Sequence, residues 1–240
     1  MNQDKKRGGP QSLLDNFSTD APHVTEVRRL LQTLLRGSRG QDARVYMLTS
    51  AARGEGKSTA SALMAMVAAR VFHRRTLLID GDMRRPCQHL LLDIAQRPGL
   101  YEYIHGRASL EAVTRPTLIP TLSAIASGHP GRATADSYDD DGFARLVAAV
   151  RPLYELIIID AAPVVPVVES TMMAEHADGL LLVAMAGQSP IPLIRRMREI
   201  LEPVQDKIVG GIVNNATEGL PYYYDYKYYG YHADRIPKSR

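Results

Sequence analysis

The segment Ala51-Ala-Arg-Gly-Glu-Gly-Lys-Ser58 decides the fold of this 240-residue chain. It follows a short apolar run at 44–49, which reads as a strand, and it leads into a stretch at 57–73 that reads as a helix. The sequence therefore predicts a strand, a glycine-containing turn and a helix in direct succession. This succession sets the order of elements that the rest of the chain follows.

The residue types in this turn suit an anion-binding loop. Gly54 and Gly56 let the backbone curl so that its N–H groups face a phosphate, and the helix that begins near Lys57 adds the positive end of its dipole. Lys57 can reach the outer phosphates of a nucleotide, and the Ser58 hydroxyl is a ligand for Mg²⁺. An ordinary glycine turn before a helix has no need of Lys-Ser after two spaced glycines. We therefore predict a phosphate-binding P-loop for Mg²⁺ and ATP, with Ala51 in place of the first glycine, whose nucleotide-binding residues are Ala52, Arg53, Gly54, Glu55, Gly56, Lys57, Ser58 and Thr59.

Two later strands end in carboxylates. The apolar run at 76–80 ends in Asp80, with Asp82 two residues further on, and the run at 153–160 ends in Asp160. Ligands of open α/β sheets bind at the carboxyl ends of the strands, so these three side chains are expected at the edge that carries the P-loop. Mg²⁺ prefers oxygen ligands and keeps several waters, so the predicted metal ligands are Ser58, Asp80 and Asp160. The alternative for any one of these aspartates is a simple cap on the turn after its strand.

The same edge supplies candidates for phosphoryl transfer. Asp82 follows the end of its strand and can project, which makes it the better candidate for the base that accepts a hydroxyl proton. Arg84 can neutralise transferring charge, although a solvated loop arginine is an equally good interpretation. The predicted catalytic residues are Lys57, Asp80, Asp82, Arg84 and Asp160.

The remaining pattern alternates strands and helices. Strands that are unbroken runs of Val, Ile and Leu, with helices between them, indicate a parallel sheet covered on both faces. We predict an α/β fold of the P-loop NTPase type, a three-layer sandwich with a mostly parallel central sheet. The predicted helices lie at 25–36 (with Thr25 as N-cap), 57–73, 90–95, 109–113, 141–150 and 192–201, and the predicted strands at 44–49, 76–80, 121–126, 153–160, 180–184 and 208–213.

Composition and charge limit the class of protein to which this chain can belong. Apolar residues make up 45% of the chain and charged residues 23%, which is typical of a globular domain. The net charge is +3, and residues 1–40 carry the whole excess, so the chain does not resemble a nucleic-acid-binding protein. The single cysteine, Cys87, allows neither a disulfide framework nor a thiolate metal site within one chain.

Residues 1–24 are expected to be a disordered extension, residues 25–216 the catalytic domain and residues 217–240 a flexible tail.

The tail is rich in tyrosine. Asp225 and Lys227 interrupt the run and cancel in charge, which argues against a stacking surface for single-stranded nucleic acid. A flexible segment can instead present several hydroxyls to a kinase site. The predicted phosphoacceptors are Tyr222, Tyr223, Tyr224, Tyr226, Tyr228, Tyr229 and Tyr231.

With these motifs in place, the sequence resembles the bacterial tyrosine kinases (BY-kinases) of capsule and exopolysaccharide systems over about residues 26–214. Residues 48–59 (LTSAARGEGKST) resemble the family's Walker A segment, residues 77–86 (LLIDGDMRRP) its D-x-D-x-R-x-P motif, and residues 156–163 (LIIIDAAP) its Walker B motif. The resemblance implies an ATP- and Mg²⁺-dependent tyrosine autokinase that phosphorylates its own tail in trans. It also implies a homo-oligomer, an activating cytoplasmic segment of a membrane polysaccharide co-polymerase, a cognate phosphotyrosine phosphatase, and a cytoplasmic protein held peripherally at the inner face of the membrane.

Position by position, the resemblance also implies roles outside the P-loop. Asn214 matches the position that contacts the adenine, and Glu26-x-x-Arg29 resembles a helical oligomerisation motif of the form Glu-x-x-Arg-x-x-Arg. The chain departs from the pattern at Gln32, where a second Arg is expected, and at Arg53, where Pro is common. It also has Ala161-Ala162 where the family usually has Ser/Thr-Pro.

Two other functions compete with this one. A partitioning or positioning ATPase would carry an extra lysine early in the P-loop, where this chain has Ala52. A nucleotide-gated scaffold without kinase activity fits the hydroxyl missing at Ala161-Ala162.

Overall fold

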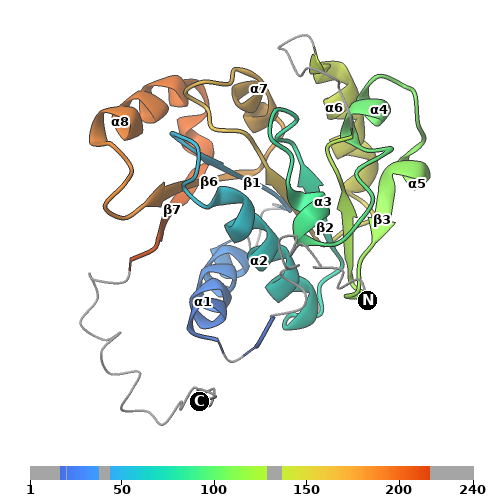
Figure 1. The fold of residues 1–240 in the computed structure, drawn as a ribbon, viewed down its shortest axis with the longest axis horizontal. Coiled ribbons are helices and arrows are strands. Elements are labelled where there is room, and N and C mark those ends of the chain that lie inside the picture. The colour runs from blue at the N-terminus through green and yellow to red at the C-terminus, as the bar shows by residue number, and fades with distance from the viewer. Residues whose placement is uncertain (1–16, 20, 38–43, 129–136, 217–240) are drawn as a thin grey trace, which may run out of the picture.

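The computed structural model describes residues 17–19, 21–37, 44–128 and 137–216. These residues form a seven-stranded sheet with helices packed on both of its faces (Figure 1). The strands are β1 (Val45–Ser50), β2 (Thr76–Asp80), β3 (Thr114–Pro116), β4 (Leu122–Ile125), β5 (Leu156–Asp160), β6 (Gly179–Met185) and β7 (Ile208–Asn214). The helices are α1 (Pro22–Gly37), α2 (Lys57–Arg70), α3 (Gln88–Leu91), α4 (Leu100–Ile104), α5 (Leu110–Val113), α6 (Asp140–Val150), α7 (Glu169–Glu175) and α8 (Ile191–Ile200), with a 3₁₀ segment η2 (Glu202–Lys207).

The strand order is β3-β4-β2-β5-β1-β6-β7, and every neighbouring pair is parallel except β3 with β4. The central strands β1, β2 and β5 are buried along their whole length, as their unbroken apolar runs predict. The strand order reverses direction at β1, so the loop after β1 lies at the topological switch point, where ligands of this architecture bind.

Alternate side chains of each strand pack into two separate hydrophobic cores, one on each face of the sheet. Leu48, Leu78 and Ile158 point to the face covered by α1 and α2, whereas Met47 and Ile79 point to the face covered by α4, α6, α7 and α8. In Figure 1, α1 and α2 accordingly lie on the opposite side of the sheet from α6, α7 and α8. The predicted three-layer α/β sandwich with a mostly parallel sheet is confirmed.

Some element bounds differ from those that the sequence predicts. Helix α1 begins at Pro22, so the predicted start at Thr25 is too late: Val24, before the predicted start, is fully buried in the core that α1 shares with α2. Strand β5 begins at Leu156 and not at 153, because Glu155 turns aside to accept a hydrogen bond from the Arg75 backbone at 3.0 Å. The sequence patterns missed α4, α7, η2 and the antiparallel edge strand β3, all of which are too short to show a period.

The predicted disordered extension and tyrosine tail fall mostly on residues that the structure leaves undescribed. Residues 1–16 and 217–240 lie outside the described residues, so these predictions stay predictions. At the N-terminal side, Phe17 packs against the α1–α2 core, and the Arg70 guanidinium lies 5.7 Å from its ring centre. Within the described ranges, no helix combines the length and the apolar character needed to cross a membrane.

One close backbone approach fixes α6 against α4. A Cβ atom added at Gly142 would overlap the carbonyl oxygen of Ile104 and lie 2.8 Å from its carbonyl carbon. Those atoms are backbone at the end of α4, so they cannot move aside as a flexible side chain could. Helix α6 therefore needs glycine at this position to reach the core through Phe143 and Leu146.

We predict that Gly142→Ala destabilises the protein. Helix propensity alone favours alanine by up to about 1 kcal/mol, but the overlap with Ile104 is expected to outweigh it and lower the free energy of unfolding by about 1–3 kcal/mol. Denaturant unfolding measures the change. Ala148→Gly, on the exposed side of the same helix, is the control for propensity, with an expected loss of about 0.5–1 kcal/mol. A stabilised Gly142→Ala variant would contradict the packing described here.

Candidate active site

Strand register brings the acidic residues to the P-loop. Asp80 and Asp160 are direct neighbours at the carboxyl ends of β2 and β5, and Leu48 of β1 pairs with Asp160 on the other side. The P-loop leaves β1 two residues further on, so it curls over the same two carboxylates. The convergence that the sequence predicts for the acidic strand ends and the P-loop is present in the structure.

The P-loop has the backbone conformation that its glycines were expected to provide. Gly54 and Gly56 have φ angles of 79° and 88°, in the left-handed region, and Gly56 directly precedes α2. A Cβ atom at Gly56 would collide with the amide of Asn214, so two separate constraints require glycine there. Residues of the first turn of α2 consequently line the depression over the P-loop.

Glu55 holds the P-loop to the opposite edge of the site. Its side chain is almost fully buried, accepts a hydrogen bond from the Ala52 backbone N–H at 2.8 Å, and accepts another from the Ser189 hydroxyl. The Glu55 carbonyl accepts a hydrogen bond from the Asn214 side chain at 3.2 Å. Ser189 also accepts from the Met185 backbone at 2.7 Å, which ties the loop to the end of β6. The Glu55 carboxylate braces the loop in this structure, and nucleotide binding at Glu55 stays a prediction.

Lys57 lies at the centre of the charged cluster. Its ammonium is 2.9 Å from Asp82 Oδ2, 3.7 Å from Asp160 Oδ1 and 3.2 Å from the Ser58 hydroxyl. Burial disfavours the charged ammonium, but the fields of Asp160 and Asp82 outweigh it, so the pKa of Lys57 is raised above its ordinary value. Lys57 is therefore a buried cation held in place by carboxylates.

Asp80 organises the loop that carries Asp82. One of its carboxylate oxygens accepts hydrogen bonds from the backbone N–H groups of Cys87 and Gln88, at 3.1 and 3.0 Å, and the other accepts from Asp82 N at 3.3 Å. Complete burial raises the pKa of Asp80 well above its usual range, and the neighbouring Asp160 adds to this rise. Asp80 thus shapes the loop from inside, whereas Asp82 reaches the P-loop.

Asp160 is also fully buried, and its pKa is raised by that burial despite the opposing field of Lys57. The Gln88 Nε2 donates to Asp160 Oδ2 at 2.8 Å, and the Ser58 hydroxyl also hydrogen-bonds this carboxylate. Gln88 was not singled out from the sequence, where only its place next to the D-x-D-x-R-x-P segment marks it. Ser61 contributes a longer contact to Asp160 at 3.5 Å.

Arg84 faces away from the phosphate loop. Its guanidinium donates to Glu169, the first residue of α7, at 2.7 Å from Nη2 and 3.2 Å from Nε. Arg53 and Arg85 are instead the exposed basic residues that line the mouth of the P-loop. A role for Arg84 in neutralising transferring charge stays a prediction, since its charge is balanced by Glu169 in this structure.

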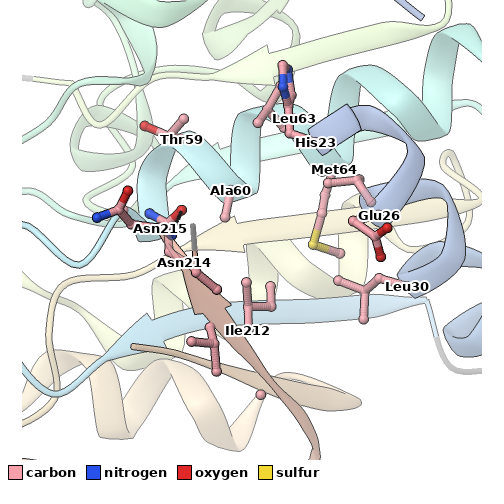
Figure 2. Close-up of a pocket in the computed structure, with 15 residues that line it drawn as sticks. His23, Glu26, Leu30, Thr59, Ala60, Leu63, Met64, Ile212, Asn214 and Asn215 are labelled. Atoms are coloured by element: carbon pink, nitrogen blue, oxygen red, sulfur yellow. Dashed lines mark hydrogen bonds between the residues drawn. The ribbon is translucent and has the colours of Figure 1, made fainter. Parts of the chain in front are cut away.

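A cavity of about 530 Å³ lies beside the P-loop between α1, α2 and β7. Figure 2 shows Thr59 and Ala60 of α2 on one side of it and Asn214 at the end of β7 on the other. Leu30 of α1 and Met64 of α2 make its deeper part apolar. This size and lining suit a flat aromatic group that carries a few polar atoms.

The residues present fit Mg²⁺ and a nucleotide. A depression of about 360 Å³ opens over the P-loop, and Gly54, Lys57, Ser58, Thr59 and Asp82 line it. Over residues 17–19, 21–37, 44–128 and 137–216, no three His, Cys, Asp or Glu side chains form a ready-made metal site. Ser58 and Asp82 in this lining offer a hydroxyl and a carboxylate, and Mg²⁺ takes oxygen ligands of this kind together with phosphate oxygens and water.

Similar proteins place the chain in a family. No protein-family model matches it. It is 29% identical to the tyrosine-protein kinase CpsD of Streptococcus agalactiae over 91% of this chain and 95% of that protein. The solved kinase domain of VpsO is 30% identical, covers 81% of this chain and 98% of that domain, and superimposes with a TM-score of 0.69.

The chain belongs to the bacterial tyrosine kinase family. It is also 30% identical to the succinoglycan biosynthesis transport protein ExoP of Rhizobium meliloti, over 85% of this chain and 27% of that longer protein. The resemblance stated from the sequence motifs is confirmed, and so is the assignment as a protein-tyrosine kinase. The comparisons favour the tyrosine kinase over the partitioning-ATPase alternative.

We predict that Lys57→Met lowers stability in a pH-dependent way. Removing the ammonium leaves Asp80, Asp82 and Asp160 without their cation, which is expected to cost about 3–5 kcal/mol near pH 8. The pKa values of Asp80 and Asp160 are already raised by burial, and losing Lys57 raises them further. The pKa of such a carboxyl is higher in the folded protein than in the unfolded chain, where it is about 4. The carboxyl therefore stabilises the folded state increasingly as the pH falls from the folded pKa toward the unfolded pKa.

In denaturant titrations, the loss in free energy of unfolding of Lys57→Met relative to wild type should therefore become smaller as the pH is lowered from 8 to 5. The double variant Lys57→Met/Asp82→Asn, which removes one of the repelling carboxylates, should recover part of the loss at pH 8. Equal deficits at both pH values would show that the charge cluster is not the cause.

Proposed function

We propose that this chain is an ATP-dependent protein-tyrosine autokinase that phosphorylates the tyrosine cluster of a neighbouring copy and so regulates capsule or exopolysaccharide synthesis and export. The observation that carries the proposal is the ion-pair cluster of Lys57 with Asp82, which lines the depression over the P-loop, and with Asp160, which is fully buried. This arrangement joins a phosphate-binding cation to a carboxylate that can accept a proton. Family membership supports tyrosine as the acceptor.

The roles of the residues follow from their positions. The backbone at Gly54 and Gly56 and the start of α2 cradle the phosphates, and Lys57 turns from Asp82 toward them when the nucleotide enters. Ser58 and Asp160 would hold Mg²⁺, with Asp80 beside them. Bound Mg²⁺ neutralises charge on the transferring phosphoryl group.

Asp82 is the proposed base. Once Lys57 engages the phosphates, the Asp82 carboxylate is free to accept the proton of a tyrosine hydroxyl. The phenolic oxygen forms the new bond to the γ-phosphorus, the bond to the bridging oxygen breaks, and ADP leaves with the electron pair. Asp82 lines the depression over the P-loop, which gives an incoming phenol access to it.

The adenine is proposed to occupy the cavity between α1, α2 and β7, next to Asn214 (Figure 2). The Asn214 amide in this structure donates to the Glu55 carbonyl, so it holds the P-loop and borders the cavity at the same time. This supports the contact that the family resemblance implies.

The phosphoacceptors are proposed to be the tail tyrosines, which lie outside the described residues. The last described residues, Asn215 and Ala216, border the nucleotide cavity, so the tail begins at the active-site edge of its own subunit. Each phosphate adds about −1.5 to −2 charges, and clustered phosphates repel one another. Phosphorylation would then loosen a homo-oligomer, and a cognate phosphatase would reset it.

The proposed partner is an activating cytoplasmic segment of a membrane polysaccharide co-polymerase, which would hold the kinase peripherally at the inner face of the membrane. The similarity to ExoP supports a place in polysaccharide synthesis. Glu26 and Arg29 of α1, which match the oligomerisation motif, form a 2.9 Å ion pair within their own helix. Both side chains are largely exposed, so this pair is weak enough to exchange for one with a second subunit.

The first test removes the proposed base. Asp82→Asn keeps the size of the side chain but cannot take up the phenolic proton, so the rate of tail phosphorylation should fall about 10²- to 10⁴-fold. Mass spectrometry of the tail after incubation with ATP, with and without the partner segment, gives the rate. Binding of ADP measured by calorimetry should persist. Undiminished phosphotyrosine in Asp82→Asn would remove Asp82 from the mechanism.

The second test separates a kinase from a nucleotide-gated scaffold. Replacing all seven tail tyrosines by Phe keeps the fold and the nucleotide site but removes every proposed acceptor. Polysaccharide output in cells should change as it does in Asp82→Asn. If both variants support normal polymer synthesis, the scaffold function gains support; if only the seven-Phe variant does, catalysis is needed but the tail is not its regulatory target.

A further inference from the structure

The side chain of Gln88 joins three parts of the active site. Its Nε2 donates to Asp160 Oδ2 at 2.8 Å and to the Ser58 carbonyl oxygen at 2.9 Å, and its own backbone N–H donates to Asp80 Oδ2 at 3.0 Å. Gln88 therefore links β2, β5 and the start of α2. It is only 1% exposed, so these contacts are made away from bulk water.

The orientation of the amide is fixed by its partners. Asp160 Oδ2 and the Ser58 carbonyl are both acceptors, so the amide nitrogen and not its oxygen must face them. This leaves Gln88 Oε1 buried and without a hydrogen-bond partner among the residues that the structure describes. A buried amide oxygen left in this way is costly, so it requires a donor that the protein itself does not supply.

Gln88 makes a short hydrogen bond to Asp160, at 2.8 Å. The contacts of Asp160 with Ser61 and Lys57 are longer, at 3.5 and 3.7 Å. The position after Asp160 is Ala161, which is fully buried and offers no hydroxyl. The Ser58 hydroxyl also hydrogen-bonds the Asp160 carboxylate, so Asp160 is oriented by the start of α2 and, through Gln88 at 2.8 Å, by the loop after β2.

We propose that Gln88 is a positioning residue for the metal site: its amide nitrogen sets the orientation of Asp160 and Ser58, and its Oε1 accepts a hydrogen bond from a water of the Mg²⁺ shell. Mg²⁺ keeps several of its waters in protein sites, and such waters are strong donors. Partners that orient metal ligands in this way typically contribute 10- to 100-fold to metal affinity or activity. The inference rests on the proposed binding of Mg²⁺ and nucleotide at this site.

The test uses Gln88→Met, which keeps the length and volume of the side chain but removes both its donor and its acceptor. The matched control is Gln96→Met, because the Gln96 amide also donates to a backbone carbonyl, that of Gly128 at 3.2 Å, but does so away from the P-loop. Calorimetry of ADP binding to the full-length protein is carried out in EDTA and across a Mg²⁺ titration, and thermal unfolding is followed in parallel.

For Gln88→Met we expect ADP binding in EDTA within about twofold of wild type, and a Mg²⁺ requirement shifted to concentrations about 10- to 100-fold higher. The same shift should appear in the Mg²⁺ dependence of autophosphorylation, while Gln96→Met matches wild type in both. Gln88→Glu, which restores an acceptor but places a second carboxylate next to Asp160, should not rescue the Mg²⁺ requirement at pH 8.

A lower melting temperature with an unchanged Mg²⁺ titration would overturn the proposal and leave Gln88 a purely structural link. Failure of the underlying function gives a different result. A wild-type protein that binds Mg²⁺-ADP but forms no phosphotyrosine would contradict the kinase proposal, while the calorimetric comparison of Gln88→Met with wild type would still decide the role of Gln88.

Discussion

The structure depends on a buried positive charge surrounded by carboxylates at one end of the sheet. Lys57 is nearly buried, and its ammonium is stabilised by Asp82 at 2.9 Å and Asp160 at 3.7 Å. A lone ammonium at this depth would lose its proton, and the carboxylates without it would take protons up, so each charge requires the other. The parallel register of β2 and β5, which sets Asp80 next to Asp160, is what concentrates these charges.

In this structure Lys57 compensates the charge of the carboxylates around it. In the proposed mechanism, the phosphates of a bound nucleotide would replace Asp82 as the partner of Lys57 and would free Asp82 to act as the base. The P-loop is braced through Glu55, whose carboxylate accepts a hydrogen bond from Ser189 and whose carbonyl accepts one from Asn214. Preorganisation of this kind lowers the reorganisation required when substrate binds.

The departures from the family pattern are best understood as a redistribution of hydrogen bonds. This chain has no hydroxyl at the position after Asp160, and Asp160 receives a short hydrogen bond from Gln88. The fold brings these two residues together because the loop after Asp80 is wrapped around the Asp80 carboxylate.

The sequence by itself determined the fold class, the P-loop and the convergence of the three aspartates. Each of these follows from local rules: unbroken apolar strands bury on both faces, glycines permit the left-handed turns at Gly54 and Gly56, and carboxyl ends of parallel strands share one edge. Only the tertiary structure decided that Arg84 pairs with Glu169, that Glu55 braces the loop and that Gln88 reaches Asp160. Those contacts join segments far apart in the chain through side chains whose direction depends on packing, and no periodicity or spacing in the sequence encodes that direction.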